Sequence, residues 1–159
     1  MNTKVFRIFI KATPQAVWDA ITQPEWTDRY GYGGRAEFDL RPGGTYRVPT
    51  PKAMLDMGAP PTIVDGEVIE SDPPRKLVQT WRALWSPEMI NEGAKRLTWE
   101  IVDAGNGVTA LTVTHELEGA PLTAVTVAGS TDIASGGGGW AWVLSDLKSL
   151  LETGKAMAA

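Results

Sequence analysis

The sequence predicts an α+β domain in which a curved antiparallel β-sheet of about seven strands wraps around one long C-terminal helix. The last helical stretch, from Gly136 to Gly154, places an apolar stripe on one face and polar residues, Asp146 among them, mostly on the other. The stripe consists of Trp140, Leu144, Leu147 and Leu151. Most of the preceding chain alternates as strands do, and Asn106-Gly107 is a hairpin signal that favours antiparallel pairing. A sheet with one apolar face needs a partner, which we expect to be the long helix.

The N-terminal region begins with a strand and two short helices. Residues 3–11 alternate between two faces, as a half-buried strand does. Thr13 as N-cap and Pro14 at the first helical position begin a helix that ends before Pro24. A second short helix is predicted from Pro24 to about Tyr30.

Six further strands are predicted between these helices and the last one. They cover residues 35–40, 45–49, 62–70, 76–84, 96–103 and 108–117. The proline-rich segment 49–61 is predicted to be a long loop, and such loops in compact domains are often functional. A short helix is predicted near residues 121–128. We expect a single domain over residues 1–154 and a frayed C-terminal tail over 155–159.

The composition argues against several functional classes. The formal net charge is −4 and no basic patch stands out, so neither nucleic acid nor an anionic membrane is an expected partner. The chain has no cysteine, which removes disulfides, thiolate nucleophiles and thiolate metal sites. With one histidine as well, we expect no metal site and no cofactor. No stretch has the apolar length of a signal peptide or a membrane span, so a cytoplasmic location is expected.

Four segments resemble a known family. They are residues 14–26 (PQAVWDAITQPEW), 40–46 (LRPGGTY), 67–81 (EVIESDPPRKLVQTW) and 139–152 (GWAWVLSDLKSLLE). Their order is similar to the helix-grip fold of the SRPBCC superfamily, which includes START domains and the birch pollen allergen. More narrowly, they resemble the family named for the activator of heat shock protein 90 ATPase homologue, C-terminal domain. The resemblance implies an apolar cavity between the sheet and the long helix. Superfamily members include lipid and hormone binders, polyketide cyclases and stress-linked proteins, with no shared catalytic triad to transfer.

Aromatic residues are the best candidates for lining such a cavity. The chain has seven tryptophans in 159 residues, and ligand pockets are mostly apolar and aromatic with a few polar groups for orientation. The expected cavity residues are Trp26, Tyr30, Tyr46, Gln79, Trp81, Trp99, His115 and Trp140. The alternative interpretation is that most of these aromatic side chains simply fill the core.

His115, the only histidine, is a weak catalytic candidate. Strand alternation places it on the inner face, where it would act as a general base or bind a ligand oxygen; the alternative is a hydrogen-bonded structural histidine. The run Gly136–Gly139 lacks the lysine and hydroxyl residues that follow the glycines of a P-loop. We interpret this run as a flexible hinge or as a close approach between backbone segments.

Three functions therefore stay open. The first is a binding domain for an apolar or aromatic small molecule, oriented by Gln79, His115 and tyrosine hydroxyls. The second is a cofactor-independent enzyme of the cyclase, dehydratase or isomerase type that uses the same cavity. The third is a stress-related or chaperone-interacting protein. An edge strand near the N-terminus leaves both a monomer and a homodimer possible.

Overall fold

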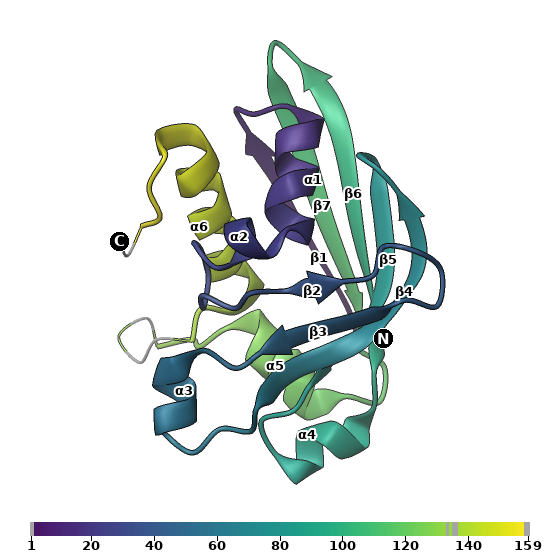
Figure 1. Cartoon of the computed structure of the whole chain (residues 1–159), viewed down its shortest axis with the longest axis vertical. Coiled ribbons are helices and arrows are strands. Elements are labelled where there is room, and N and C mark those ends of the chain that lie inside the picture. Colours follow the sequence, from purple (N-terminus) through teal and green to yellow (C-terminus); the bar gives the residue numbers. More distant parts are fainter. Residues whose placement is uncertain (1, 133, 135–136, 158–159) are drawn as a thin grey trace.

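The structure is a computed structural model that describes residues 2–132, 134 and 137–157. Within these residues, seven strands form one sheet in the order β1-β7-β6-β5-β4-β3-β2, and all neighbours are antiparallel. The strands are β1 (Thr3–Ile10), β2 (Glu37–Phe38), β3 (Thr45–Pro49), β4 (Thr62–Asp72), β5 (Lys76–Ala83), β6 (Lys95–Gly105) and β7 (Val108–Glu116). The helices are α1 (Pro14–Thr22), α2 (Pro24–Thr27), α3 (Lys52–Asp56), α4 (Pro87–Glu92), α5 (Pro121–Ala128) and α6 (Gly139–Thr153). This architecture, drawn in Figure 1, confirms the predicted fold class.

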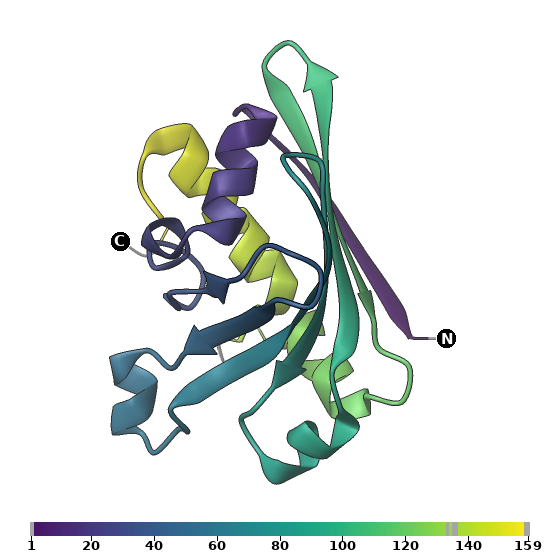
Figure 2. The same cartoon turned by 45° about the vertical axis from the view of Figure 1, so that its right-hand side comes forward.

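The sheet curves, and α1 and α6 lie together against its concave side (Figure 2). The curvature has a local cause in β4, where the pairing with β5 shifts register between Val68 and Glu70, and an extra residue of this kind bends a strand. Gly66 lies just before this shift, and a Cβ there would lie 1.9 Å from the carbonyl oxygen of Thr80. Only glycine therefore fits at residue 66, and the bend turns β4, β3 and β2 toward α6.

Local sequence signals place the helices. The Thr13 hydroxyl accepts a hydrogen bond from the Ala16 backbone N–H at 3.1 Å, as the predicted N-cap of α1 requires. Helix α6 ends at Gly154, which adopts the left-handed conformation (φ 82°) and donates its N–H to the Leu150 carbonyl. The predicted apolar stripe faces the core, with Leu144 and Leu147 fully buried.

Asp146 departs from the pattern predicted for the long helix. It is 2% exposed, whereas the sequence placed it mostly on the polar face. Its carboxylate accepts hydrogen bonds from the backbone N–H of Gly31 at 2.8 Å and of Met157 at 2.6 Å. Residues 155–157, expected to fray, therefore return to α6 and contact it; residues 158–159 lie outside the described part.

Two short helices were not predicted. Segment 49–61, expected to be a loop, contains α3, and the stretch after β5 contains α4, which is capped by the Ser86 hydroxyl. Each is shorter than two turns, so no apolar periodicity develops over its length. Strand β2 is also shorter than expected, and α2 ends at Thr27. No helix within the described residues is long and apolar enough to cross a membrane.

Candidate functional site

A cavity of about 330 Å³ lies between α6 and the bent half of the sheet. Strands β2 to β6, the two helices after β1, α3 and α5 also contribute side chains to its wall. None of the described side chains that line it carries a formal charge. The cavity is therefore an uncharged space with many aromatic side chains in its wall, of a kind and size typical of small-molecule sites.

Five of the eight expected cavity residues line this space. They are Tyr30, Tyr46, Trp81, Trp99 and Trp140. Three indole rings come together in the wall, since the Trp140 ring centroid lies 5.4 Å from that of Trp99 and 6.2 Å from that of Trp81. Strands β3, β5 and β6 and the first turn of α6 thus bring together residues that are far apart in the sequence. Whether they contact a ligand stays a prediction.

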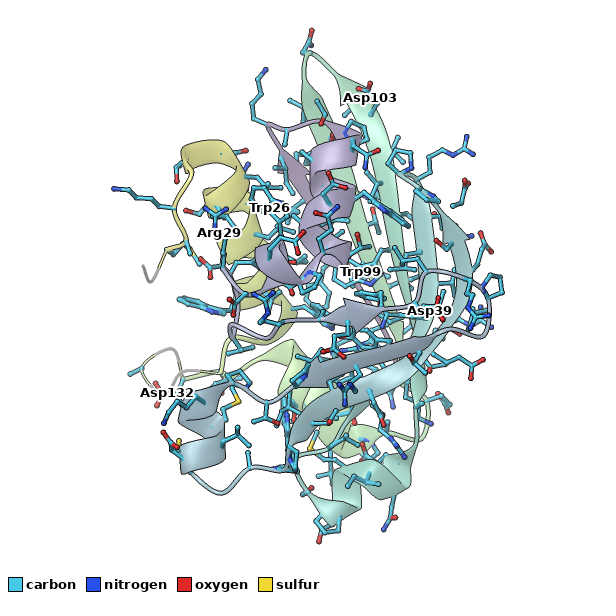
Figure 3. All side chains as sticks on the ribbon, in the orientation of Figure 1. Trp26, Arg29, Asp39, Trp99, Asp103 and Asp132 are labelled. Carbon is cyan, nitrogen blue, oxygen red and sulfur yellow. The ribbon has the colours of Figure 1, made fainter. Side chains whose placement is uncertain are left out.

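Trp26 was expected at the cavity but does not line it. The side chain is half-buried in α2, and the Arg29 guanidinium lies 4.8 Å from its ring centroid, a cation–π contact. Figure 3 shows the two side chains together at this helix, with Trp99 deeper, on the sheet side. Because α2 has only four residues, its apolar side could not be assigned from periodicity.

Gln79 and His115 also differ from expectation, because both lie behind the cavity wall. Neither is exposed to solvent at all, and neither is among the described lining residues. Each instead accepts a hydrogen bond from an indole N–H of a lining tryptophan. Trp99 Nε1 donates to Gln79 Oε1 at 2.9 Å, and Trp140 Nε1 donates to His115 Nδ1 at 3.1 Å. The two polar side chains thus orient the aromatic wall from behind.

Other lining residues are not among the eight that were expected. They include Tyr32, Phe38, Val48, Met54, Trp85, Val127 and Val143. Met54 comes from the segment 49–61, which was expected to be functional but without a named residue. Phe38 shares a cross-strand position with Tyr46, and their rings lie 4.6 Å apart. A signal that could have found Phe38 is the turn-forming sequence Arg41-Pro42-Gly43-Gly44, which lies between the two strands and allows them to pair.

The hydroxyl groups of the lining tyrosines differ in their partners. Tyr30 donates its O–H to the Ala20 carbonyl at 2.8 Å, and Tyr32 accepts the N–H of Gly139 at 3.2 Å. Burial raises the pKa of Tyr30 and of Tyr46 far above the ordinary value of 10, so both stay neutral at any physiological pH. For Tyr46, burial has the larger effect, and interactions with the side chains of Trp81 and Gln79 lower the pKa in part.

The geometry around His115 favours the structural interpretation over general-base catalysis. Burial lowers its pKa from 6.5 to about 4, so the ring is neutral near pH 7. Because an indole N–H can only donate, the contact with Trp140 leaves Nδ1 unprotonated and places the proton on Nε2. Nε2 has no hydrogen-bond partner among the described residues. The one basic lone pair of the ring is therefore already engaged by Trp140.

Gly139, the first residue of α6, packs against the end of α5 at the edge of the cavity. Its φ is 62°, and a Cβ there would lie 2.2 Å from the Val127 carbonyl oxygen and 2.6 Å from the Gly129 nitrogen. Of the two interpretations of Gly136–Gly139, a close approach between backbone segments therefore holds at Gly139; Gly136 lies outside the described residues. In the part of the chain that the structure describes, no three His, Cys, Asp or Glu side chains gather as metal ligands would.

Solved structures with low sequence identity share this fold. Protein MLL2253 from Mesorhizobium loti is 18% identical with a TM-score of 0.68, over 94% of this chain and 96% of that chain. The Aha1 dimer from Colwellia psychrerythraea is 18% identical with a TM-score of 0.65, over 98% and 100%. CalU16 from Micromonospora echinospora is 21% identical with a TM-score of 0.52; 71% of this chain matches 59% of CalU16, so the chain spans less than two thirds of that protein.

The sequence comparisons agree with the fold. The search of curated proteins gave no match. The model of one protein family, by contrast, matches residues 11–152, which include every element from α1 to nearly the end of α6. The match confirms the resemblance found in the sequence: the chain belongs to the family described as activator of Hsp90 ATPase homolog 1-like protein.

Proposed function

We propose that the protein binds a small, mostly apolar or aromatic molecule in the cavity between the sheet and α6, without a cofactor. The observation that carries this proposal is the cavity of about 330 Å³ whose described lining side chains are all uncharged and in large part aromatic. Such a wall binds by removing apolar surface from water, at roughly 25 cal/mol for each Å² buried. It offers no site for a charged group.

The two alternative functions have less support. A cyclase, dehydratase or isomerase could use His115 or a tyrosine as its polar group. His115 lies behind the wall with Nδ1 engaged by Trp140, which leaves a lining tyrosine as the candidate for such chemistry. A chaperone-interacting role rests on the family description. A homodimer, like a cytoplasmic location, stays a prediction, although the Aha1 protein from Colwellia psychrerythraea is a dimer.

Titration with N-phenyl-1-naphthylamine, a neutral probe that fluoresces in apolar surroundings, tests the proposal. We expect saturable binding of one probe per chain. In the variant Val143→Trp, a larger side chain from α6 enters the cavity, because Val143 lines it. This variant is expected to weaken probe binding at least tenfold.

The matched control is Ala141→Trp, which adds the same indole on the exposed side of the same helix. It should bind the probe as the wild-type protein does. Circular dichroism of both variants establishes that they are folded. Binding that is unsaturable in the wild type, or equally strong in Val143→Trp and wild type, would contradict a ligand site in this cavity.

A further inference from the structure

We propose that two copies of this chain associate through the edge strand β1, which pairs antiparallel with β1 of the second copy about a two-fold axis at Val5. No residue of β1 is among the described residues that line the cavity, so this surface is separate from the proposed ligand site. The inference follows from which backbone groups of β1 are open, which are occupied, and which side chains each register places opposite one another.

The two edges of the sheet differ in length. Strand β2, at one edge, has two residues, whereas β1, at the other, has eight. A long edge strand presents a row of N–H and C=O groups that can pair with another chain, and proteins commonly shorten or cover such edges. Figure 2 shows the N-terminal half of β1 at the rim of the sheet, away from α1 and from the C-terminal end of α6. Strand β1 is therefore the edge to which a further strand can be added.

The pairing of β1 with β7 decides which backbone groups reach this edge. The Leu117 N–H donates to the Asn2 carbonyl at 2.6 Å, which makes these two residues a hydrogen-bonded pair. Hydrogen-bonded and non-hydrogen-bonded pairs alternate along an antiparallel ladder, and the register continues unshifted to Ile10 opposite Thr109. The even-numbered residues of β1 therefore bond to β7, and the odd-numbered residues direct their N–H and C=O groups toward the edge.

Helix α6 occupies the C-terminal part of the edge. The Lys148 ammonium donates to the Phe9 carbonyl at 2.6 Å, and the Glu152 carboxylate accepts the N–H of Lys11 at 2.8 Å. Within the described part of the chain, the residues of β1 whose two outward groups both lack a hydrogen-bond partner are Thr3, Val5 and Arg7. The open part of the edge is thus short and is centred on Val5.

A two-fold axis at Val5 uses this open part completely. Val5 then faces Val5 of the second copy, and Arg7 faces Thr3 of the second copy, so that each of these pairs exchanges two backbone hydrogen bonds. The axis also brings together two valine side chains that are each 59% exposed in the single chain, and apolar cross-strand pairs stabilise a sheet. The Arg7 guanidinium does not cover the edge, because its Nε donates to the Thr112 hydroxyl of β7 at 2.8 Å.

The other two-fold registers are less favourable. Only odd-numbered residues can pair with each other, because their groups face the edge in both copies. An axis at Lys4 or at Arg7 places two like charges directly opposite each other, which is destabilising. An axis at Phe6 needs the Phe9 carbonyl, which α6 already occupies. An axis at Thr3 leaves the Arg7 backbone groups without a partner.

Sedimentation velocity across the micromolar range tests the association. We expect a reversible dimer that dissociates at micromolar concentration, because a single strand pair buries less surface than a stable interface does. In Val5→Pro the lost N–H points to the edge, so every hydrogen bond with β7 is kept, as for prolines on natural edge strands. This variant should weaken the dimer at least tenfold and should still bind N-phenyl-1-naphthylamine as wild type does.

Cysteine cross-linking tests the register, because the chain has no cysteine of its own. Across a hydrogen-bonded pair the two Cα atoms lie about 5.5 Å apart, which a disulfide can span, so Val5→Cys should form a disulfide-linked dimer in oxidised glutathione. The matched control is Val102→Cys. Val102 is 60% exposed, against 59% for Val5, but it lies on β6, two strands from the edge. It should cross-link at least tenfold more slowly.

Three results would overturn the proposal. They are a wild-type protein that stays monomeric throughout the micromolar range, a dimer that persists undiminished in Val5→Pro, and equal rates of cross-linking in Val5→Cys and Val102→Cys. Should circular dichroism show that Val5→Pro does not fold, the two cysteine variants decide the question. All three results leave the cavity as a ligand site, which is tested by probe binding alone.

Discussion

Protonation of His115 is predicted to destabilise the fold in mild acid. The ring is buried against Trp81 and Trp140, and its pKa in the folded protein is about 4 against 6.5 in an unfolded chain. Between pH 6.5 and about pH 4 the imidazole is protonated in the unfolded chain and neutral in the folded protein, so the free energy of unfolding falls as the pH falls. Above about pH 7 the ring is neutral in both states and has no such effect.

The size of the effect follows from the two pKa values. One unit of difference in pKa corresponds to about 1.4 kcal/mol, so the difference between 6.5 in the unfolded chain and about 4 in the folded protein lowers the free energy of unfolding by about 3 kcal/mol in total. Roughly 2 kcal/mol of this is lost by pH 5, and the loss levels off below about pH 4. This is a large part of the stability of a typical domain, which is about 5–15 kcal/mol.

Urea unfolding followed by circular dichroism at pH 7, 6 and 5 measures the loss. The comparison variant is His115→Asn, because its side-chain oxygen can still accept the Trp140 N–H but it cannot ionise. Carboxylates titrate equally in both proteins, so the difference between the two stabilities isolates the histidine. We expect wild type to lose about 2 kcal/mol more than His115→Asn between pH 7 and 5. Parallel pH profiles would refute the assignment of a neutral, buried imidazole.

Two further predictions concern the backbone around α6. Gly139→Ala should lower the free energy of unfolding, measured in urea, by about 3 kcal/mol or more, since its Cβ would overlap the Val127 carbonyl. The control is Gly137→Ala, where φ is also positive but the space around the Cβ is open, and it should cost only about 1 kcal/mol. Similar losses in the two variants would contradict the close approach at Gly139. Asp146→Ala leaves two backbone N–H groups without an acceptor and should cost about 2–4 kcal/mol, against less than 0.5 kcal/mol for the exposed Ser145→Ala. Equal effects at these two positions would show that the Asp146 carboxylate is not needed.

The sequence by itself determined the fold class and most of its elements. Three of its features depend only on neighbouring residues in the chain, so local sequence patterns predicted them. They are the alternation over β1, β6 and β7, the Asn106-Gly107 turn and the apolar stripe of α6. The aromatic composition likewise indicated the cavity, and five of its expected residues line it. The short helices α3 and α4 were not predicted, because a helix shorter than two turns has no apolar periodicity to detect.

Only the tertiary structure decided which polar side chains face the cavity. Alternation placed Gln79 and His115 on the inner face correctly. Side chains on an inner face can either line the cavity or lie in the layer behind its wall. Trp99 and Trp140 take the lining positions, and Gln79 and His115 accept their N–H groups from behind. Asp146 shows the same limit, because its burial depends on backbone groups 115 and 11 residues away. Such contacts are set by the packing of distant segments, which no local pattern in the chain records.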